Sequence, residues 1–166
     1  MNTEYWIDTL KLEPHPEGGY YKEVYRSDEN ISEHALPKRF GGNRSFSTSI
    51  YFLLRSEDRS LFHKIKSDEL WHFYAGSSLT IYILKENTLI TKVLGSPERS
   101  NGELQVVVPA NCWFGAKVNE PGSFVLAGCT VSPGFDFHDF EMAKRSTLLS
   151  DYPAHRNIVE ALTVNE

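Results

Sequence analysis

The feature that most constrains the fold is a series of short segments between residues 45 and 131 in which apolar and polar side chains alternate. Alternation with a period of two is typical of strands that have one buried face. The expected strands are 46–54, 61–66, 69–74, 79–84, 89–94, 104–108, 113–118 and 124–131. Short strands at a spacing of roughly 8–12 residues, separated by turn residues, indicate an all-β sandwich or barrel.

The flanking segments differ from this pattern. Near-helical spacing of apolar residues predicts a short helix over 3–12, with Thr3 as a candidate N-cap. Two prolines and two glycines in 14–19 end that helix, a strand follows at 20–25, and 27–44 is expected to be a long surface loop. Short helices are expected at 146–149 and 155–162. A length of 166 residues fits one domain, 1–166.

Charge and composition exclude several classes of protein. The net charge is −5 and there is no run of basic residues, so we expect no nucleic-acid partner. The first residues lack the features of a signal peptide and no apolar segment approaches membrane-spanning length, so we expect no membrane association. Cys112 and Cys129 lie in apolar, strand-like segments, and we interpret them as small core residues of a cytoplasmic protein.

Two ionisable side chains are expected to point into the interior. Side chains of a strand alternate between its faces, so His63 shares a face with Leu61 and Ile65. On the next strand Glu69 shares a face with aromatic residues, and His72 lies on the opposite face. Because a carboxylate in apolar surroundings is costly unless it is paired, we expect His63, on an adjacent strand, to be the partner of Glu69.

The stretch around these two residues resembles the first motif of the cupin superfamily. That motif reads His-x-His, then a Glu, then a Gly seven residues after the Glu; here His63, Glu69 and Gly76 match it. The position of the second His, which is a metal ligand in the family, is occupied by Ile65.

The second cupin motif is also altered in this chain. It places Pro-x-Gly before another ligand His, whereas here Asn111 stands at the Gly and Phe114 at the ligand position. The resemblance therefore retains only His63 and Glu69 of four metal-ligand positions, fewer than zinc, iron or manganese sites use. We expect no cofactor; a divalent metal, if present, would be held by His63 and Glu69.

Four segments resemble, more specifically, the DUF985 (Cupin_5) family of small cupins of unknown function. They are residues 12–21, 48–54, 67–76 and 128–137, which span most of the chain in order. The family is similar in fold to dTDP-sugar epimerases and germins. The resemblance implies a cupin-type jelly-roll β-barrel with short terminal helices, a homodimer, and a pocket inside each barrel.

Three functions are compatible with such a pocket, and whether the chain is an enzyme stays open. The first is a metal-independent isomerase or epimerase of a sugar or nucleotide sugar, with His63 as the base beside a carbonyl and Glu69 orienting it. The second is a non-catalytic module that binds or senses a sugar, nucleotide or nucleotide sugar. The third is a metal-dependent enzyme with a degenerate site. The expected ligand-binding residues are Thr48, Trp71, Phe73, Phe114, Arg26 and Asp136.

Each of these residues also has a purely structural alternative. The pair of His63 and Glu69 could be a buried polar pair without a role in binding, and the aromatic residues could be core. Arg26 could form a surface or interface ion pair, and Asp136 could accept backbone hydrogen bonds in the turn after Pro133. His15 is interpreted first as a turn residue, with pocket contact as the alternative.

Overall fold

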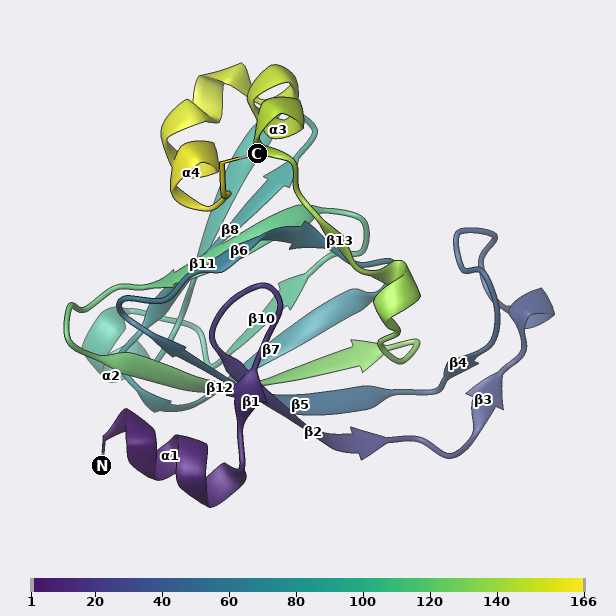
Figure 1. Cartoon of the computed structure of the whole chain (residues 1–166), viewed down its shortest axis with the longest axis horizontal. Helices are drawn as coiled ribbons and strands as arrows, with labels where there is room; N and C mark the ends of the chain where they lie inside the picture. The colour runs from purple at the N-terminus through teal and green to yellow at the C-terminus, as the bar shows by residue number, and fades with distance from the viewer. Residues whose placement is uncertain (1, 166) are drawn as a thin grey trace.

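The computed structural model describes residues 2–165 and contains two antiparallel β-sheets that face each other (Figure 1). The six-stranded sheet consists, in spatial order, of β1 (Glu13–Pro14), β2 (Tyr20–Arg26), β5 (Thr48–Arg55), β12 (Phe124–Ser132), β7 (Asp68–Gly76) and β10 (Gln105–Val108). The five-stranded sheet consists of β13 (Glu141–Met142), β6 (Ser60–Lys64), β11 (Trp113–Val118), β8 (Leu79–Lys85) and β9 (Thr88–Leu94). The predicted all-β jelly roll with short helices is confirmed, and its strands pair as these two sheets, apart from a separate two-stranded sheet of β3 and β4.

The main core lies between the sheets because alternate residues of every long strand point inward. Its buried members from the two sheets include Phe52, Trp71, Leu79, Ile81, Val106 and Phe114. β7 ends at Gly76 with φ +97°, where an added Cβ would lie 2.0 Å from the carbonyl oxygen of Phe124. Only glycine fits this approach to β12, which explains the glycine of the first motif. Asn111, which replaces the second-motif glycine, also takes a left-handed φ of 60°.

Short helices cover the outer faces of both sheets. Helix α1 (Thr3–Leu10) packs Trp6 and Ile7 against buried Leu53 and Leu126 of the six-stranded sheet. Its N-cap is Asn2, whose side chain accepts the Tyr5 N–H, so the predicted cap at Thr3 is corrected by one residue.

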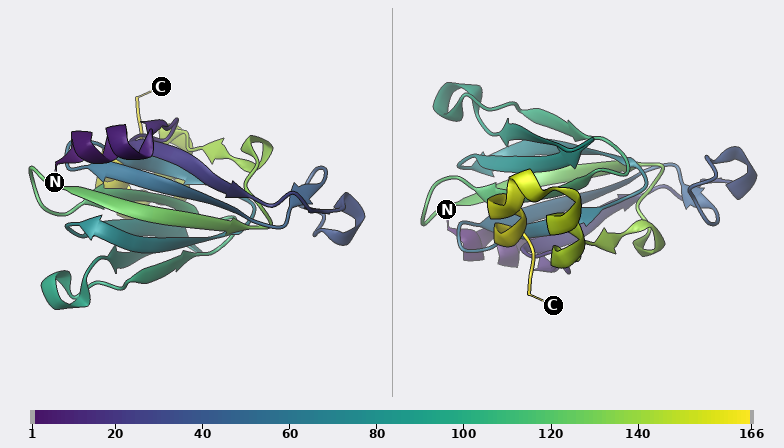
Figure 2. Two further views of the ribbon diagram at one scale, coloured as in Figure 1. Left: turned by 90° about the horizontal axis from the view of Figure 1, so that it is seen from below. Right: turned by 90° about the horizontal axis from the view of Figure 1, so that it is seen from above.

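The C-terminal helices lie over the five-stranded sheet. They are α3 (Arg145–Asp151), η3 (Pro153–His155) and α4 (Arg156–Ala161). Phe62 of β6 points outward, away from the main core, and packs with Leu148, Val159 and Leu162 of this helical layer. Figure 2 shows α1 over the strands in one view and the C-terminal helices over them in the opposite view.

Some short elements were not predicted. The expected loop 27–44 contains η1 (Glu33–Ala35) and a hairpin of β3 (Asn30–Ile31) with β4 (Arg44–Ser45), which projects from one end of the sheets (Figure 1). Helix α2 (Pro97–Ser100) lies between β9 and β10, and η2 (Phe137–Asp139) follows β12.

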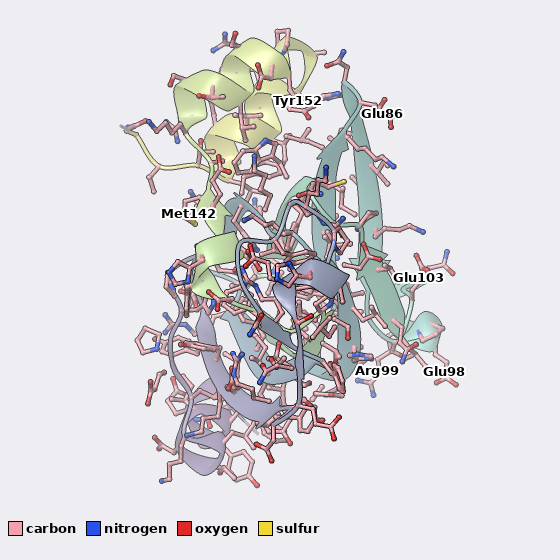
Figure 3. The ribbon with its side chains drawn as sticks, turned by 90° about the vertical axis from the view of Figure 1, so that its right-hand side faces the viewer. Glu86, Glu98, Arg99, Glu103, Met142 and Tyr152 are labelled. Atoms are coloured by element: carbon pink, nitrogen blue, oxygen red, sulfur yellow. The ribbon has the colours of Figure 1, made fainter. Side chains whose placement is uncertain are left out.

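Charged side chains of the β8–β9 hairpin, of α2 and of the segment between α2 and β10 stand on the outside of the molecule. Figure 3 shows Glu86, Glu98 and Glu103 pointing away from the sheets. Among the described residues, no helix has both the length and the apolar character needed to cross a membrane.

Candidate functional site

A cavity of about 580 Å³ lies between the sheets, and its lining is mainly apolar. Its apolar and aromatic lining residues are Tyr21, Ile50, Phe52, Ile65, Val131, Phe135, Phe137 and Phe140. Its polar lining residues are His15, Glu17, Glu23, Arg26, Thr48, His63, Glu69, Cys129, Asp136 and His138. Among the ionisable ones, Glu17, His63 and Glu69 are buried and form the floor, whereas Arg26 and His138 are exposed and mark the mouth.

The central contact of the floor joins His63 of β6 to Glu17. The His63 Nε2 atom lies 3.0 Å from Glu17 Oε2, and His63 Nδ1 lies 2.7 Å from the carbonyl oxygen of Leu61. Because a carbonyl oxygen only accepts, Nδ1 carries a proton, and Nε2 facing a carboxylate needs one as well. The geometry therefore fits an imidazolium paired with a carboxylate.

The electrostatics of this pair agree with its geometry. Burial acts to lower the pKa of His63, but the charge of Glu17 and its hydrogen bond outweigh burial and raise that pKa above its ordinary value. Burial acts to raise the pKa of Glu17, but His63, His15 and Ser60 together lower it. Glu17 is thus the carboxyl of the floor that stays ionised.

A tight turn brings Glu17 to this position. Gly18 has φ +113°, and a Cβ on it would lie 2.0 Å from the carbonyl oxygen of Arg59, so only glycine allows the turn to approach the start of β6. Ser60 Oγ donates to Glu17 Oε1 at 2.7 Å, and the Leu61 N–H donates to the Glu17 carbonyl at 2.9 Å. The sequence Pro-His-Pro-Glu-Gly-Gly therefore positions a carboxylate.

His15, in the same turn, is both a turn residue and part of the cavity lining. The Glu17 N–H donates to His15 Nδ1 at 3.2 Å, so the proton of the neutral ring is on Nε2. Burial lowers the pKa of His15, which favours this neutral form, although Glu17 opposes the shift. The ring packs edge-on against Tyr21 with centroids 4.6 Å apart. His15 is therefore a neutral hydrogen-bond donor.

Glu69 reaches the cavity from the opposite sheet. In the register of the six-stranded sheet, Thr48 and Glu69 both pair with Val131, which places their inward side chains in one row. Burial and the charge of Glu17 raise the pKa of Glu69 to about 7, while His63 and a hydrogen bond with Cys129 act to lower it. Glu69 is therefore divided between its acid and carboxylate forms at neutral pH.

The structure corrects the predicted pairing of His63 with Glu69. The two residues lie on strands of different sheets, β6 and β7, rather than on adjacent strands. The direct partner of His63 is Glu17, which was not predicted from the sequence, and Glu69 acts on His63 through its charge. The catalytic role assigned to His63 and Glu69 stays a prediction, and Cys129, interpreted as core, is buried but also lines the cavity beside Glu69.

Three predicted ligand-binding residues line the cavity. Thr48 shares the inward face with Ile50 and Phe52, as expected, and its Oγ1 accepts the Phe135 N–H at 2.9 Å. Arg26 lies at the mouth in an ion pair with Glu23, with its Nη2 2.8 Å from Glu23 Oε2. Asp136 accepts hydrogen bonds from the backbone N–H and the ring of His138, so it does accept a backbone hydrogen bond in the turn, as the structural alternative predicted. Whether any of the three binds a ligand stays a prediction.

The three predicted aromatic residues do not line the cavity. Trp71 and Phe114 are each 1% exposed and belong to the core, and the partly buried Phe73 packs against it. Phe114 packs on the ring of His63, with centroids 4.2 Å apart. The aromatic residues that do line the cavity, and that were not predicted, are Tyr21, Phe52, Phe135, Phe137 and Phe140.

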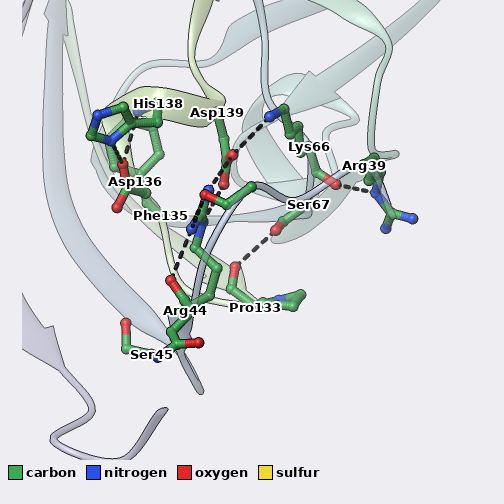
Figure 4. A network of polar contacts seen from close by, with 12 residues as sticks. Arg39, Arg44, Ser45, Lys66, Ser67, Pro133, Phe135, Asp136, His138 and Asp139 are labelled. Atoms are coloured by element: carbon green, nitrogen blue, oxygen red, sulfur yellow. Dashed lines mark hydrogen bonds and ion pairs between the residues drawn. The ribbon is translucent and has the colours of Figure 1, made fainter. Parts of the chain in front are cut away.

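Three of these rings come from the segment 133–140, which closes one side of the mouth and is held by polar contacts (Figure 4). Arg44 of β4 donates twice to the buried carboxylate of Asp139, from Nε at 2.6 Å and from Nη2 at 2.7 Å. Lys66 Nζ lies 3.2 Å from the same carboxylate, and Ser67 Oγ donates to the carbonyl oxygen of Pro133 at 2.8 Å. These contacts fix in place the aromatic wall, by which we mean Phe135, Phe137 and Phe140.

The residues present do not fit the metal centre that the superfamily motif implies. Ile65 and Phe114 stand at two ligand positions and have no donor atom. Both ring nitrogens of His63 already face protein oxygen atoms. Among residues 2–165, no group of three or more His, Cys, Asp or Glu side chains is arranged to hold a metal ion.

The comparisons with known proteins agree with this structure. A protein of solved structure from Shewanella oneidensis is 40% identical, with a TM-score of 0.89 over 100% of this chain and 99% of that chain. A hypothetical protein from Leishmania major is 33% identical, with a TM-score of 0.88 over all of both chains. Oxalate decarboxylase from Bacillus subtilis is 13% identical, with a TM-score of 0.55 over 92% of this chain and 37% of that chain, and shows the fold alone.

None of the curated proteins matches the chain. The sequence pattern that defines the family Cupin_5, described as "Cupin superfamily (DUF985)", matches residues 4–143. This match covers most of the length, and the two highly similar structures extend over the whole chain. The chain therefore belongs to the DUF985 family of the cupin superfamily.

Proposed function

We propose that the cavity catalyses proton transfer next to a carbonyl group and so isomerises or epimerises a small, sugar-like ring compound. The observation that carries the proposal is the pair of carboxyl groups on the cavity floor. The charge of His63 holds Glu17 ionised, whereas burial raises the pKa of Glu69 to about 7. Environments that shift the pKa values of two neighbouring titratable groups in opposite directions are typical of acid/base sites.

Glu69 is the proposed base. Its carboxylate takes a proton from the carbon next to the carbonyl, the C–H electron pair forms a C=C bond, and the carbonyl oxygen becomes an enolate oxygen. Neutral His15, through its Nε2–H, and the hydroxyl of Thr48 are the donors that line the cavity for that oxygen.

Completion of the reaction depends on where the proton returns. Protonated Glu69 can return the proton to the former carbonyl carbon. The hydroxyl group on the deprotonated carbon then passes its proton to the former carbonyl oxygen and becomes the new carbonyl, which gives an isomer. Alternatively, water protonates the opposite face of the original carbon and Glu69 releases its proton to water, which gives an epimer.

His63 takes a different part from the one expected from sequence. Its Nδ1 is bonded to Leu61 and its Nε2 to Glu17, so neither nitrogen is free to accept a proton from a ligand. In the proposal His63 keeps Glu17 ionised on the floor, and the negative charge of Glu17 in turn helps to raise the pKa of Glu69. His63 and Glu17 are therefore positioning residues, and Glu69 is the catalytic one.

The test is incorporation of deuterium from D2O into free aldoses and ketoses, followed by proton NMR. We expect the wild type to exchange the proton next to the carbonyl, at a rate that rises with pH through about 7 as Glu69 ionises. Glu69→Gln removes the base and should abolish exchange, whereas Glu98→Gln, an exposed change on α2, should not alter it. Exchange that survives in Glu69→Gln rejects this mechanism.

A binding or sensing module without catalysis is the second candidate. This candidate is favoured because both ring nitrogens of His63 are already hydrogen-bonded to protein atoms. Among the described residues, Glu69 is then the only buried carboxyl of the floor that has no direct ionic partner and could contact a ligand. A ligand that binds in the cavity but exchanges no proton would support this candidate over the isomerase.

A further inference from the structure

The charged groups at the mouth of the cavity are already matched to one another. Arg26 donates to Glu23 twice, from Nε at 3.0 Å and from Nη2 at 2.8 Å. Its Nη1 donates to Ser45 Oγ at 3.2 Å, and its Nη2 also donates to the carbonyl oxygen of Phe135 at 3.1 Å. Each nitrogen of the Arg26 guanidinium thus donates to at least one protein acceptor, and the side chain connects β2, β4 and the segment 133–140.

The other basic side chains of the lining are histidines, and two of them face carboxylates. His63 faces Glu17 at 3.0 Å on the floor, and His138 Nδ1 lies 2.7 Å from Asp136 Oδ1 at the mouth. His15 is neutral because burial lowers its pKa. Within the described chain, the lining contains no lysine and no arginine other than Arg26.

Among the described residues that line this cavity, an anionic ligand would therefore meet no Arg or Lys side chain without a protein partner. A phosphate or carboxylate that lost its water there would gain no charge-assisted hydrogen bond to offset the cost. It would also approach the ionised carboxylate of Glu17 and the carboxyl of Glu69, both on the floor. The electrostatics of the lining oppose ligands with negative charge.

An uncharged ring compound meets complementary groups. The Nε2–H of His15 and the hydroxyl of Thr48 are neutral donors, and Glu69 both donates and accepts around neutral pH. The aromatic faces of the wall suit the apolar face of a sugar ring. A volume of about 580 Å³ is in the range of sites for small organic molecules.

We propose that the cavity selects uncharged, hydroxylated ring compounds such as free sugars, and rejects their phosphorylated, nucleotide-linked and acidic derivatives. This proposal narrows the substrate class of the proposed isomerase. It depends on the proposed function in one respect, namely that the ligand carries a carbonyl group. It also removes nucleotides and nucleotide sugars from the range of ligands expected from the sequence.

The test uses the side-chain methyl groups of Ile50 and Ile65, which both line the cavity, as NMR reporters of binding. The probes are glucose, galactose and rhamnose, each beside its 1-phosphate and its nucleoside diphosphate ester at equal concentration. We expect the free sugars to shift these methyl signals and the charged derivatives to leave them unchanged. A charged derivative that shifts them at least as strongly overturns the proposal, and so does the absence of any shift with the free sugars.

A single substitution should weaken the exclusion of anionic ligands. Glu23→Gln removes the carboxylate that engages Arg26, and both side chains are about 40% exposed, so the fold should tolerate the change. Freed from Glu23, Arg26 can pair with phosphate, and we expect nucleoside diphosphate sugars to bind about tenfold or more tightly than to the wild type. The matched control is Glu57→Gln, which removes a carboxylate 3.4 Å from Arg55, away from the cavity, and should change nothing.

The outcomes separate this proposal from the proposed reaction. Methyl shifts report binding whether or not chemistry follows, so free sugars that bind without deuterium exchange reject the isomerase and leave the charge selectivity standing. If Glu23→Gln binds nucleoside diphosphate sugars no more tightly than the wild type does, the pairing of Arg26 is not what excludes anions, and the proposal fails.

Discussion

Replacement of Glu69 by glutamine should make the protein more stable at alkaline pH, although it removes a proposed catalytic group. A carboxyl whose pKa rises from 4.5 to about 7 on folding is neutral in the native state over a range where the unfolded chain is already ionised. Stability is therefore lost as pH rises from 4.5 to 7, and the full loss is present above 7. Glutamine keeps the shape of the protonated form and cannot ionise, so it avoids this loss.

The size of the effect follows from the shift in pKa. Linkage gives a loss of about 3 kcal/mol at pH 8 and of less than about 1 kcal/mol at pH 5 for the wild type. Urea unfolding of the wild type and Glu69→Gln at both pH values should show the variant gaining about 2–3 kcal/mol, relative to the wild type, between pH 5 and pH 8. The exposed Glu98→Gln is the control. Parallel pH profiles for the wild type and Glu69→Gln would refute the reasoning.

Three further predictions concern the neighbouring pairs and the assembly. Glu17→Gln leaves His63 buried without its partner. The variant's free energy of unfolding should therefore fall further below that of the wild type at pH 5 than at pH 8, because His63 is charged at the lower pH. An equal loss of stability at the two pH values would contradict the ion pair. Asp139→Asn should cost about 3–5 kcal/mol in urea unfolding by leaving Arg44 unpaired inside, whereas Asp58→Asn at a more exposed pair should cost less than about 1 kcal/mol; similar losses would contradict the assigned burial. Light scattering should give a dimer, about twice 18.9 kDa, and a monomeric mass would reject the dimer that the family resemblance implies.

The strands were predictable because their signal is local. A period of two marks one inward face, and β11 agrees with its predicted bounds while β7, β8 and β9 extend only slightly beyond theirs. The same signal gave the inward direction of Thr48, His63 and Glu69, all of which line the cavity.

Alternation does not say how far along the interior a side chain lies. Trp71 and Phe114 point inward, as expected, but they sit at a level that is filled by neighbouring side chains. The open level lies nearer the end where Phe135 and Phe140 fold over, and those two rings come from a segment without strand periodicity. Their position depends on tertiary contacts such as that of Arg44 with Asp139.

The pairing of His63 was mispredicted for a related reason. The strands around His63 and Glu69 are separated by a short turn, which resembles a hairpin, but the chain crosses there from one sheet to the other. Glu17 was missed because it lies in a turn, where no periodicity indicates direction. The available signal was that Glu17 stands directly before Gly18 and Gly19. Two successive glycines allow a turn that is tight enough to bring the side chain of Glu17 against another strand.

The most direct test of the account is an NMR titration of the side-chain carboxyl carbons of the glutamates. We predict that one glutamate titrates with a pKa of about 7, that its signal disappears in Glu69→Gln, and that the signal of Glu17 titrates below the ordinary range. If Glu69 instead titrates at its ordinary value near 4.5, the cavity holds no acid/base group poised for neutral pH and the proposed reaction is contradicted.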